Sequence, residues 1–290
     1  LTSRAVADRY LQSAARFLDL LQVRPERTVC DLHPLYVSTR LVRELFPDLE
    51  PLRVPHHRAH LAALLADREI EPPLLGWVLD GTGYGEDGTV WGGELLLEEG
   101  TRCLRLGHLL PAPLPGGDRS VREPWRFAAS LLVQTFGPTE GLRRAQALFP
   151  SRAGILGGLA PLLEAPETPR TSSCGRLFDG AAALLGLRET VSYDGQAAME
   201  LEACARGAGR LPFAGEIRGD RWVVDWRPAV AALADPGPEG TVSARAAAFH
   251  GGLAEALGEG ARWAADRTGV RRVGLTGGCF QNRRLLSLVC

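Results

Sequence analysis

Apolar residues recur along this chain in two patterns, one with helical spacing and one in short uninterrupted runs. Near the start, Val6, Tyr10 and Phe17 fall on one face of a helix. This spacing predicts a helix that ends before Pro25. The run at residues 74–80 is apolar and ends in a carboxylate, which predicts a buried strand.

The two patterns alternate along the chain, so predicted helices alternate with predicted strands, which predicts an α/β fold. Prolines and glycines gather at residues 109–118, which predicts a boundary between an N-terminal lobe, residues 1–112, and a mainly helical lobe, residues 113–290. Further strands are predicted at residues 28–32, 52–54, 90–97, 103–110, 221–225 and 271–276. Further helices are predicted at residues 38–45 (capped by Ser38), 57–66, 121–136, 139–148, 175–185, 196–206 and 244–268.

Composition narrows the class of protein. Of the 290 residues, 45% are apolar and 23% are charged, as in globular proteins with a sizeable core. The net charge of −1 gives no general attraction to nucleic acid or to an anionic membrane. No apolar run approaches the roughly 18 residues that span a bilayer, and the six cysteines form no CxxC pair. We therefore expect a cytoplasmic protein with reduced thiols and without nucleic acid or membrane as partner. Because the chain opens on Leu1, we also expect a fragment of a longer protein.

Three histidines lie within the five residues HHRAH at 56–60. His56 and His60 are four residues apart, so on a helix they share one face and can bind one divalent cation. His57 and Arg58 would then point elsewhere. The alternative is a helix start with exposed or hydrogen-bonded histidines. A zincin-type protease is disfavoured, because the glutamate of its HExxH motif is replaced by His57.

Asp80 ends the predicted strand at 74–80 and is followed by the glycine-rich segment GTGYGEDGT. Glycines at 81, 83 and 85 allow close approach of the backbone to phosphate oxygens. The carboxylate of Asp80 can complete a site for a hard cation. The alternative is an ordinary hairpin turn between two strands. The segment matches neither a Walker A loop nor the GxGxxG of a Rossmann fold.

Three later segments carry weaker signals. Gly277 and Gly278 follow a predicted strand and open a helix, where free N–H groups favour an anion; the alternative is a tight turn between the strand and the helix. Asp179 is either a solvated acid in the first turn of a helix or an acceptor for ribose hydroxyls. Glu200 has the same two readings. Cys279 is not expected to be a catalytic thiol, because no histidine lies near it in the sequence.

The order of these motifs resembles the HypF family, the carbamoyltransferases of nickel–iron hydrogenase maturation. The resemblance rests on HHRAH, DGTGYGEDGTVWGGE, PLPGGDRSVREPWR, SSCGRLFD, YDGQAAMELE and GGCFQN, and it covers essentially the whole chain. It implies a two-lobed, actin-like ATPase fold of the ribonuclease H-like type, incomplete at both ends. The corresponding module of the family is similar to the tRNA threonylcarbamoyl-transferase subunit.

The resemblance also implies a function. In the family, carbamoyl phosphate and ATP give carbamoyl-adenylate in an upstream module. The module seen here would transfer the carbamoyl group to the C-terminal cysteine thiol of a HypE-like partner. Later dehydration of the product yields the cyanide ligands of the hydrogenase iron.

Roles for single residues follow from the same resemblance. His56, His60 and Asp80 match a metal-binding and catalytic site that would hold one divalent ion, iron or zinc. The segments matched to ATP or carbamoyl-adenylate binding divide into two groups. Phosphate contacts are implied for Gly81, Thr82, Gly83, Gly277 and Gly278, and ribose or adenine contacts for Gly175, Asp179, Glu200 and Asn282.

Three departures from the family pattern stand out. Arg58 replaces a third consecutive histidine, which lies outside the ligand pair. The chain ends at Cys290, before an Asn-Asp-Gly-Gly segment that supplies a further metal ligand in the family. It also begins after the first phosphate hairpin and lacks the upstream modules, so we expect an incomplete reaction and weaker metal retention.

The alternatives to this function are an O-carbamoyltransferase of natural-product synthesis and a truncated, non-catalytic nucleotide-binding module. A tRNA-modifying role is disfavoured by the absence of basic charge.

Overall fold

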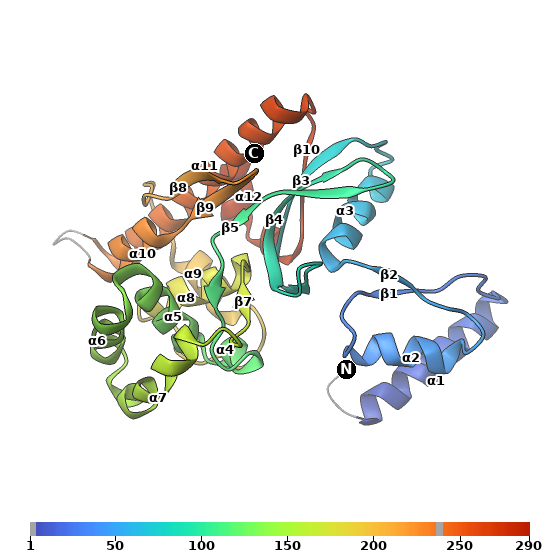
Figure 1. Ribbon diagram of the computed structural model, residues 1–290, viewed down its shortest axis with the longest axis horizontal. Coiled ribbons are helices and arrows are strands. Elements are labelled where there is room, and N and C mark those ends of the chain that lie inside the picture. Colours follow the sequence, from blue (N-terminus) through green and yellow to red (C-terminus); the bar gives the residue numbers. More distant parts are fainter. Residues whose placement is uncertain (1–3, 236–239) are drawn as a thin grey trace.

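The computed structural model of this protein describes residues 4–235 and 240–290 as a mixed α/β fold (Figure 1). The first elements are α1 (Arg4–Leu21), β1 (Val29–Asp31), α2 (Val37–Leu45), β2 (Leu52–Val54), α3 (His56–Asp67), β3 (Leu74–Tyr84), β4 (Val90–Glu98), β5 (Cys103–Leu109) and β6 (Ala112–Pro113). A helical region follows with α4 (Asp118–Arg122), α5 (Pro124–Phe136), α6 (Pro138–Leu148), η1 (Pro150–Arg152), α7 (Ala153–Glu164), β7 (Arg170–Thr171), α8 (Cys174–Leu184) and α9 (Gln196–Cys204). The last elements are β8 (Ala214–Arg218), β9 (Arg221–Asp225), α10 (Arg227–Ala234), α11 (Val242–Thr268), β10 (Val273–Thr276), η2 (Gly278–Gln281) and α12 (Arg283–Val289).

One curled sheet joins strands from distant parts of the chain, in the order β10-β3-β4-β5-β9-β8. β10 and β3 are parallel, β3, β4 and β5 form an antiparallel meander, and β9 runs parallel to β5. The short strands β6 and β7 join this sheet beside β4. Because β10 pairs with β3, the segment after β10 emerges next to the end of β3. The proposed division of the chain at residue 112 stays a prediction.

Strand β3 is buried on both faces, and its side chains alternate between two cores. Leu75, Trp77 and Leu79 belong to the large core shared with α5, α8 and α11. Leu74 and Val78 belong to a smaller core under α3. Trp77 Nε1 donates a hydrogen bond to the carbonyl oxygen of Leu257 on α11, at 2.9 Å. Both faces of β3 are therefore fixed by packing, which gives its end a defined position.

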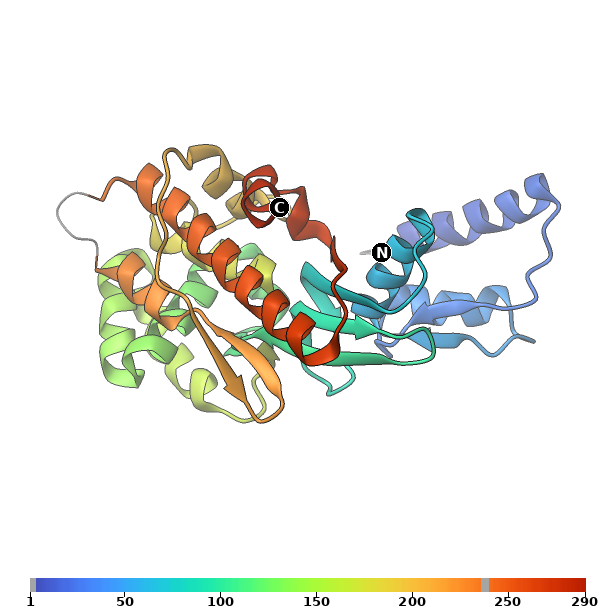
Figure 2. The same cartoon turned by 90° about the horizontal axis from the view of Figure 1, so that it is seen from above.

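The N-terminal segment forms a separate group at one end of the molecule (Figures 1 and 2). It consists of α1, α2 and the parallel pair β1–β2, in which Asp31 lies opposite Val54. Strand β2 leads through Pro55, an extended residue, directly into α3. This connection places His56 at the first position of α3, beside the end of β1.

Two predictions about where elements end were wrong. Strand β3 does not end at Asp80 but continues to Tyr84, where it pairs with Val90 after a register shift between Leu79 and Gly83. The tight turn therefore lies after Tyr84 rather than directly after Asp80. The predicted helix at 121–136 is divided at Glu123, because Pro124 begins a new helix instead of continuing the old one.

Several elements were not predicted at all. Helix α7 contains three glycines and Pro161, which weaken any helical signal in its sequence. Helix α10 is short and begins on a proline, and β6–β8 have only two to five residues. Ser38 does not cap α2, because the cap position is Tyr36.

Candidate functional site

The ends of several elements meet beside Asp80. The residue lies on β3, where the strand leaves its regular register. The first turn of α3 covers it from one side, and the start of α8 lies against it from another. The segment after β10 completes the group, since a Cβ atom on Gly278 would lie 3.0 Å from Asp80 Oδ1.

His56, His60 and Asp80 form a compact cluster. The Nε2 atoms of both histidines lie 3.1 Å from the same carboxylate oxygen, Asp80 Oδ2. One ligand atom from each residue lies within 4.8 Å of the others, as a shared cation requires. All three side chains are partly exposed, so an ion and a ligand can reach them. The geometry thus fits the helical i and i+4 pairing.

Asp31 holds the other side of His56. Its Oδ2 lies 3.0 Å from His56 Nδ1, so the ring stands between two carboxylates. If Nδ1–H donates to Asp31, a neutral ring presents Nε2 as a free lone pair to Asp80. Two electron-rich atoms then face each other, and either a proton or a bound cation at Nε2 resolves this contact. The residues present therefore fit a metal ion.

The pKa values in the cluster follow from these contacts. The hydrogen bond to Asp80 raises the pKa of His56, burial lowers it, and Asp31 raises it again, with a net upward shift. Burial raises the pKa of Asp80, but the hydrogen bonds from His56, His60 and the Gly81 N–H outweigh it and hold the pKa far below its usual value. Asp80 is therefore ionised at neutral pH and suited to a cation.

His57 has a structural place. It is fully buried against Trp91 and below Gly83, where a Cβ atom would lie 2.4 Å from the His57 ring. Burial lowers the pKa of His57 to about 4, so the ring is neutral at physiological pH. Its direction away from the ligand pair confirms the helical phase expected from the sequence.

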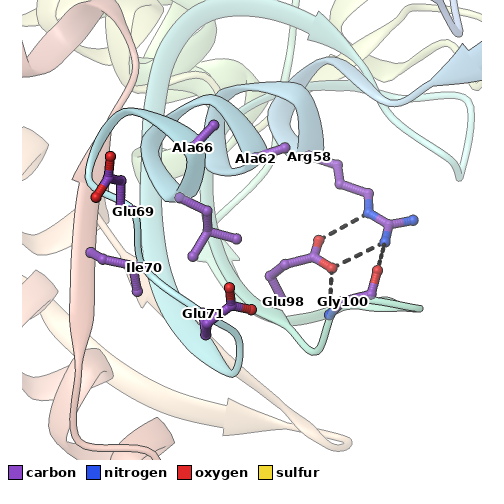
Figure 3. A pocket seen from close by; sticks show the side chains of 9 residues that line it. Arg58, Ala62, Ala66, Glu69, Ile70, Glu71, Glu98 and Gly100 are labelled. Carbon is purple, nitrogen blue, oxygen red and sulfur yellow. Dashed lines mark hydrogen bonds and ion pairs between the residues drawn. The ribbon is translucent and has the colours of Figure 1, made fainter.

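Arg58 is not part of the cluster and instead reaches from α3 to Glu98 and Gly100 (Figure 3). Its Nε and Nη2 atoms donate to the two carboxylate oxygens of Glu98, at 2.9 and 3.0 Å. Nη2 also donates to the carbonyl oxygen of Gly100. This two-pronged pair ties the first turn of α3 to the end of β4, which holds His56 and His60 in place over Asp80.

A cavity of about 400 Å³ opens on the other side of Asp80. Six of the residues singled out from the sequence line it: Asp80, Gly81, Gly175, Asp179, Gly278 and Asn282. The remaining lining comes from Arg176, Phe178, Asp194, Gly195, Ala198, Met199, Glu202, Cys279 and Gln281. Asp80 therefore belongs both to the histidine cluster and to the cavity.

The start of α8 is packed tightly against β3. Ser173 caps the helix, since its Oγ accepts from the Arg176 N–H at 3.0 Å and donates to the Gly81 carbonyl oxygen at 2.6 Å. A Cβ atom on Gly175 would lie 2.9 Å from Gly81 Cα, so only glycine permits this approach. The helix start, with its free N–H groups and positive dipole end, thereby faces the cavity beside Asp80.

Arg176 and Asp179 form a buried pair in the cavity wall. Arg176 Nη2 and Asp179 Oδ2 are 3.0 Å apart, and both side chains are less than a tenth exposed. Burial raises the pKa of Asp179 to about 6, although the charge of Arg176 lowers it and that of Asp194 raises it. Asp179 therefore changes charge near neutral pH, which suits a group that accepts hydrogen bonds from a ligand when ionised.

Four of the residues matched to nucleotide binding do not line this cavity. Thr82 is exposed, and Gly83 lies beneath His56 and His57. Gly277 lies against the Leu79 carbonyl with a φ of 98°. Glu200 forms an ion pair with Arg188 at 2.6 Å on the surface of α9.

Glu202 lines the cavity but was not predicted from the sequence as a site residue. On α9 the cavity is lined at positions 195, 198, 199 and 202, which share one helical face, whereas position 200 does not. Glu202 accepts hydrogen bonds from the N–H groups of Arg283 and Arg284 at the start of α12, at 2.8 and 3.3 Å. Helical phase within the motif YDGQAAMELE would have favoured it over Glu200.

A cavity that meets a helix start, glycine backbone and a histidine–carboxylate cluster is typical of proteins that bind a nucleotide together with a metal ion. Comparison with known proteins identifies the family. The family model described as HypF Kae1-like domain matches residues 1–67, and that described as carbamoyltransferase, Kae1-like domain, second subdomain, matches residues 76–290. The chain belongs to the HypF carbamoyltransferase family, as its motifs predicted.

Curated relatives are similar over nearly the whole chain. The carbamoyltransferase HypF of Rhizobium leguminosarum bv. viciae is 43% identical over 272 residues, which are 93% of this chain and 34% of that protein. A carbamoyltransferase HypF homolog of Cupriavidus necator is 41% identical over 285 residues, which are 93% of this chain and 71% of that protein. The chain thus spans about a third of the first relative and over two thirds of the second.

Two solved structures share the fold. A full-length HypF in its phosphate- and nucleotide-bound form matches with a TM-score of 0.88 and 31% identity, over 100% of this chain and 38% of its own. The HypF of T. kodakarensis matches with a TM-score of 0.89 and 30% identity, over 99% and 39%. These matches confirm the predicted α/β, actin-like fold class. Within residues 4–235 and 240–290, no helix has the length and apolar character needed to cross a membrane.

Proposed function

We propose that this chain is the carbamoyl-transfer module of a HypF protein, which moves a carbamoyl group from carbamoyl-adenylate to a protein thiol. The observation that carries the proposal is the double position of Asp80, in the histidine cluster and in the wall of the cavity. A ligand in this cavity can contact a metal ion and helix N–H groups at the same time. The family name of its relatives and the nucleotide-bound state of one solved relative support the same assignment.

The cavity suits the adenylate half of the substrate. Phe178 and Met199 offer apolar surface for a purine ring. Asp179 and Glu202 are carboxylates placed to accept hydrogen bonds from ribose hydroxyls. The backbone at Gly81, Gly175 and Gly278, with the start of α8, would hold the phosphate.

The charge of the cavity calls for a cation. The cavity is lined by one arginine, Arg176, and by four carboxyl groups, those of Asp80, Asp179, Asp194 and Glu202. An anionic nucleotide is repelled by this surplus unless a cation accompanies it. His56, His60 and Asp80 would hold that ion, for which imidazole and carboxylate ligands suit iron or zinc. The bound ion would supply Lewis-acid stabilisation of negative charge on the substrate oxygens.

The reaction replaces one bond to the carbamoyl carbon by another. The acceptor sulfur, as a thiolate, attacks this carbon and forms a C–S bond. The C–O bond to the phosphate then breaks, AMP leaves with the electron pair, and the thiol proton passes to solvent. The start of α8 and the backbone beside Gly278 are placed to stabilise the charge that grows on the leaving phosphate.

The wider reaction extends the proposal to the complete protein. ATP and carbamoyl phosphate would form carbamoyl-adenylate in the regions that the longer relatives possess beyond this match. The acceptor would be the C-terminal cysteine of a HypE-like partner, and the product would become the cyanide ligands of a nickel–iron hydrogenase. All six cysteines of this chain are free thiols, which accords with a site of action in the reducing cytoplasm.

Labelled carbamoyl transfer tests the proposal. Carbamoyl-adenylate with ¹⁴C in the carbamoyl group is supplied to this chain with a divalent metal and a HypE-like protein that ends in cysteine. We expect label on the acceptor, loss of most label with His56→Ala/His60→Ala, and no label on an acceptor that ends in serine. Undiminished transfer by the double variant contradicts the role of the cluster, and equal labelling of the serine acceptor indicates an O-carbamoyltransferase.

A further inference from the structure

His250 lies inside the protein behind the wall of the cavity. It belongs to α11, has no exposed surface, and packs against Phe178, with 5.2 Å between the ring centroids. Its Nδ1 lies 2.7 Å from the carbonyl oxygen of Ala246, one turn earlier in the helix. Because a carbonyl oxygen only accepts, Nδ1 carries the proton, and Nε2 of the neutral ring is an acceptor.

Nε2 of His250 meets the side-chain amide of Asn282. The amide nitrogen Nδ2 lies 3.0 Å from Nε2, and so donates one of its two N–H bonds to the ring. The amide oxygen Oδ1 accepts from the Leu285 N–H at 2.8 Å and thereby caps α12. Both ends of the amide are therefore fixed, and a flip would place two donors and two acceptors against each other.

The second N–H of the Asn282 side-chain amide is not used by His250. Asn282 lines the cavity, and its second N–H has no partner among residues 4–235 and 240–290. We infer that His250 is a positioning residue that locks the Asn282 amide, so that the cavity presents an N–H donor at this point and selects a hydrogen-bond acceptor. In a nucleoside phosphate that acceptor is a ring nitrogen or a ribose oxygen. This inference rests on the nucleotide-binding role proposed above.

The lock depends on a neutral ring. A second proton on Nε2 would face the donating amide and break the contact. Burial lowers the pKa of His250 and the nearby Arg284 lowers it further, while the Ala246 carbonyl and Glu202 raise it. The net pKa lies below the ordinary value, so the ring is neutral at physiological pH.

Three variants of this chain test the lock. In His250→Gln, the side-chain amide reaches about as far as Nε2 and its oxygen can still accept from Asn282. In His250→Leu, the acceptor is gone while an apolar residue fills the space. The dissociation constant for ATP is measured by calorimetry at pH 7.5, and the folded fraction of each variant by circular dichroism. We expect His250→Gln to bind within about 3-fold of wild type and His250→Leu to bind roughly 10-fold more weakly, the scale of one lost hydrogen bond. Equal affinities of the two variants overturn the inference.

The third variant, Asn282→Asp, tests the contact between residue 282 and His250 in the absence of a nucleotide. In Asn282→Asp a carboxylate faces Nε2 and attracts a proton, so the pKa of His250, followed by NMR, rises by at least about one unit. An unchanged pKa overturns the lock even if a histidine variant fails to fold. Failure of the wild type to bind ATP would instead count against the proposed function, and NMR then decides the lock alone. As pH falls, ATP affinity should also weaken more in wild type than in His250→Gln, because any contribution from protonation of Asp179 is common to both proteins.

Discussion

The Asp31 carboxylate lies 3.0 Å from Nδ1 of His56, while Nε2 of the same ring lies 3.1 Å from Asp80. The two acids are 49 positions apart and reach the ring from different strands, β1 and β3. Asp31 thereby determines which ring nitrogen is free to bind a metal ion. A carboxylate behind a ligating histidine also increases the electron density that the ring offers the metal.

Loss of Asp31 should weaken metal binding without removing a ligand. We expect Asp31→Ala to reduce the affinity for Zn²⁺ by ~10–100-fold, the range found for such supporting carboxylates. Competition with a chromogenic chelator measures the affinity. Asp48→Ala, at an exposed acid of the same segment, is the control and should match wild type. Equal affinities for all three proteins would show that Asp31 does not orient His56.

The buried acid Asp179 should make stability depend on pH. Its folded pKa of about 6 exceeds the unfolded value of 3.8, so the native state binds more protons between these two values. Stability should therefore fall as pH rises from about 4 to about 6 and then level off, by a contribution of about 3 kcal/mol. Urea unfolding of wild type and Asp179→Asn across this window measures the difference. Parallel profiles for the two proteins would contradict the raised pKa.

The pair between Arg58 and Glu98 should stabilise the fold. Glu98 is 3% exposed, so Arg58→Ala leaves a buried carboxylate without its cation. We expect a loss of about 2 kcal/mol in the free energy of unfolding, less than for a fully buried pair because Arg58 is partly exposed. The control is Arg43→Ala, which removes the exposed pair with Glu50 and should cost under ~1 kcal/mol. A similar cost for both variants in urea titrations would count against a supporting role for Arg58.

The close contact of α8 with β3 should not tolerate a methyl group. In Gly175→Ala the new Cβ would lie 2.9 Å from Gly81 Cα, so the helix start must move away from the phosphate position. We expect ATP affinity to fall by at least ~10-fold in calorimetry, because the positioning of the helix N–H groups is lost. Gly158→Ala in helix α7, where a Cβ atom meets nothing within 4 Å, is the matched control and should keep full affinity. Wild-type binding by Gly175→Ala would exclude this phosphate site.

Local patterns predicted what depends on local geometry. The apolar run at residues 74–80 identified β3, although not its end, and the spacing of His56 and His60 identified a shared helical face. These features follow from local composition and from backbone periodicity, and they need no knowledge of the rest of the chain. The family and the fold class were confirmed for a further reason, because the order of several motifs carries more information than each motif alone.

Features that depend on distant pairing were not predicted. Asp31 reaches His56 only because β1 pairs with β2, which leads into α3. The continuation of β3 past Asp80 depends on pairing between Tyr84 and Val90, which no local rule separates from a turn. His250 and Asn282 are 32 positions apart, and their contact exists only when α12 folds back against α11.

Anomalous X-ray diffraction from crystals grown with Zn²⁺ and a non-hydrolysable ATP analogue shows directly whether Asp80 joins a metal ion and a nucleotide in one site. We expect one zinc peak within about 2.0–2.2 Å of His56 Nε2, His60 Nε2 and an Asp80 oxygen. We also expect analogue phosphate at Gly81 and Gly278. A zinc ion bound elsewhere, or a nucleotide outside the cavity that Asp80 lines, would contradict the joint site.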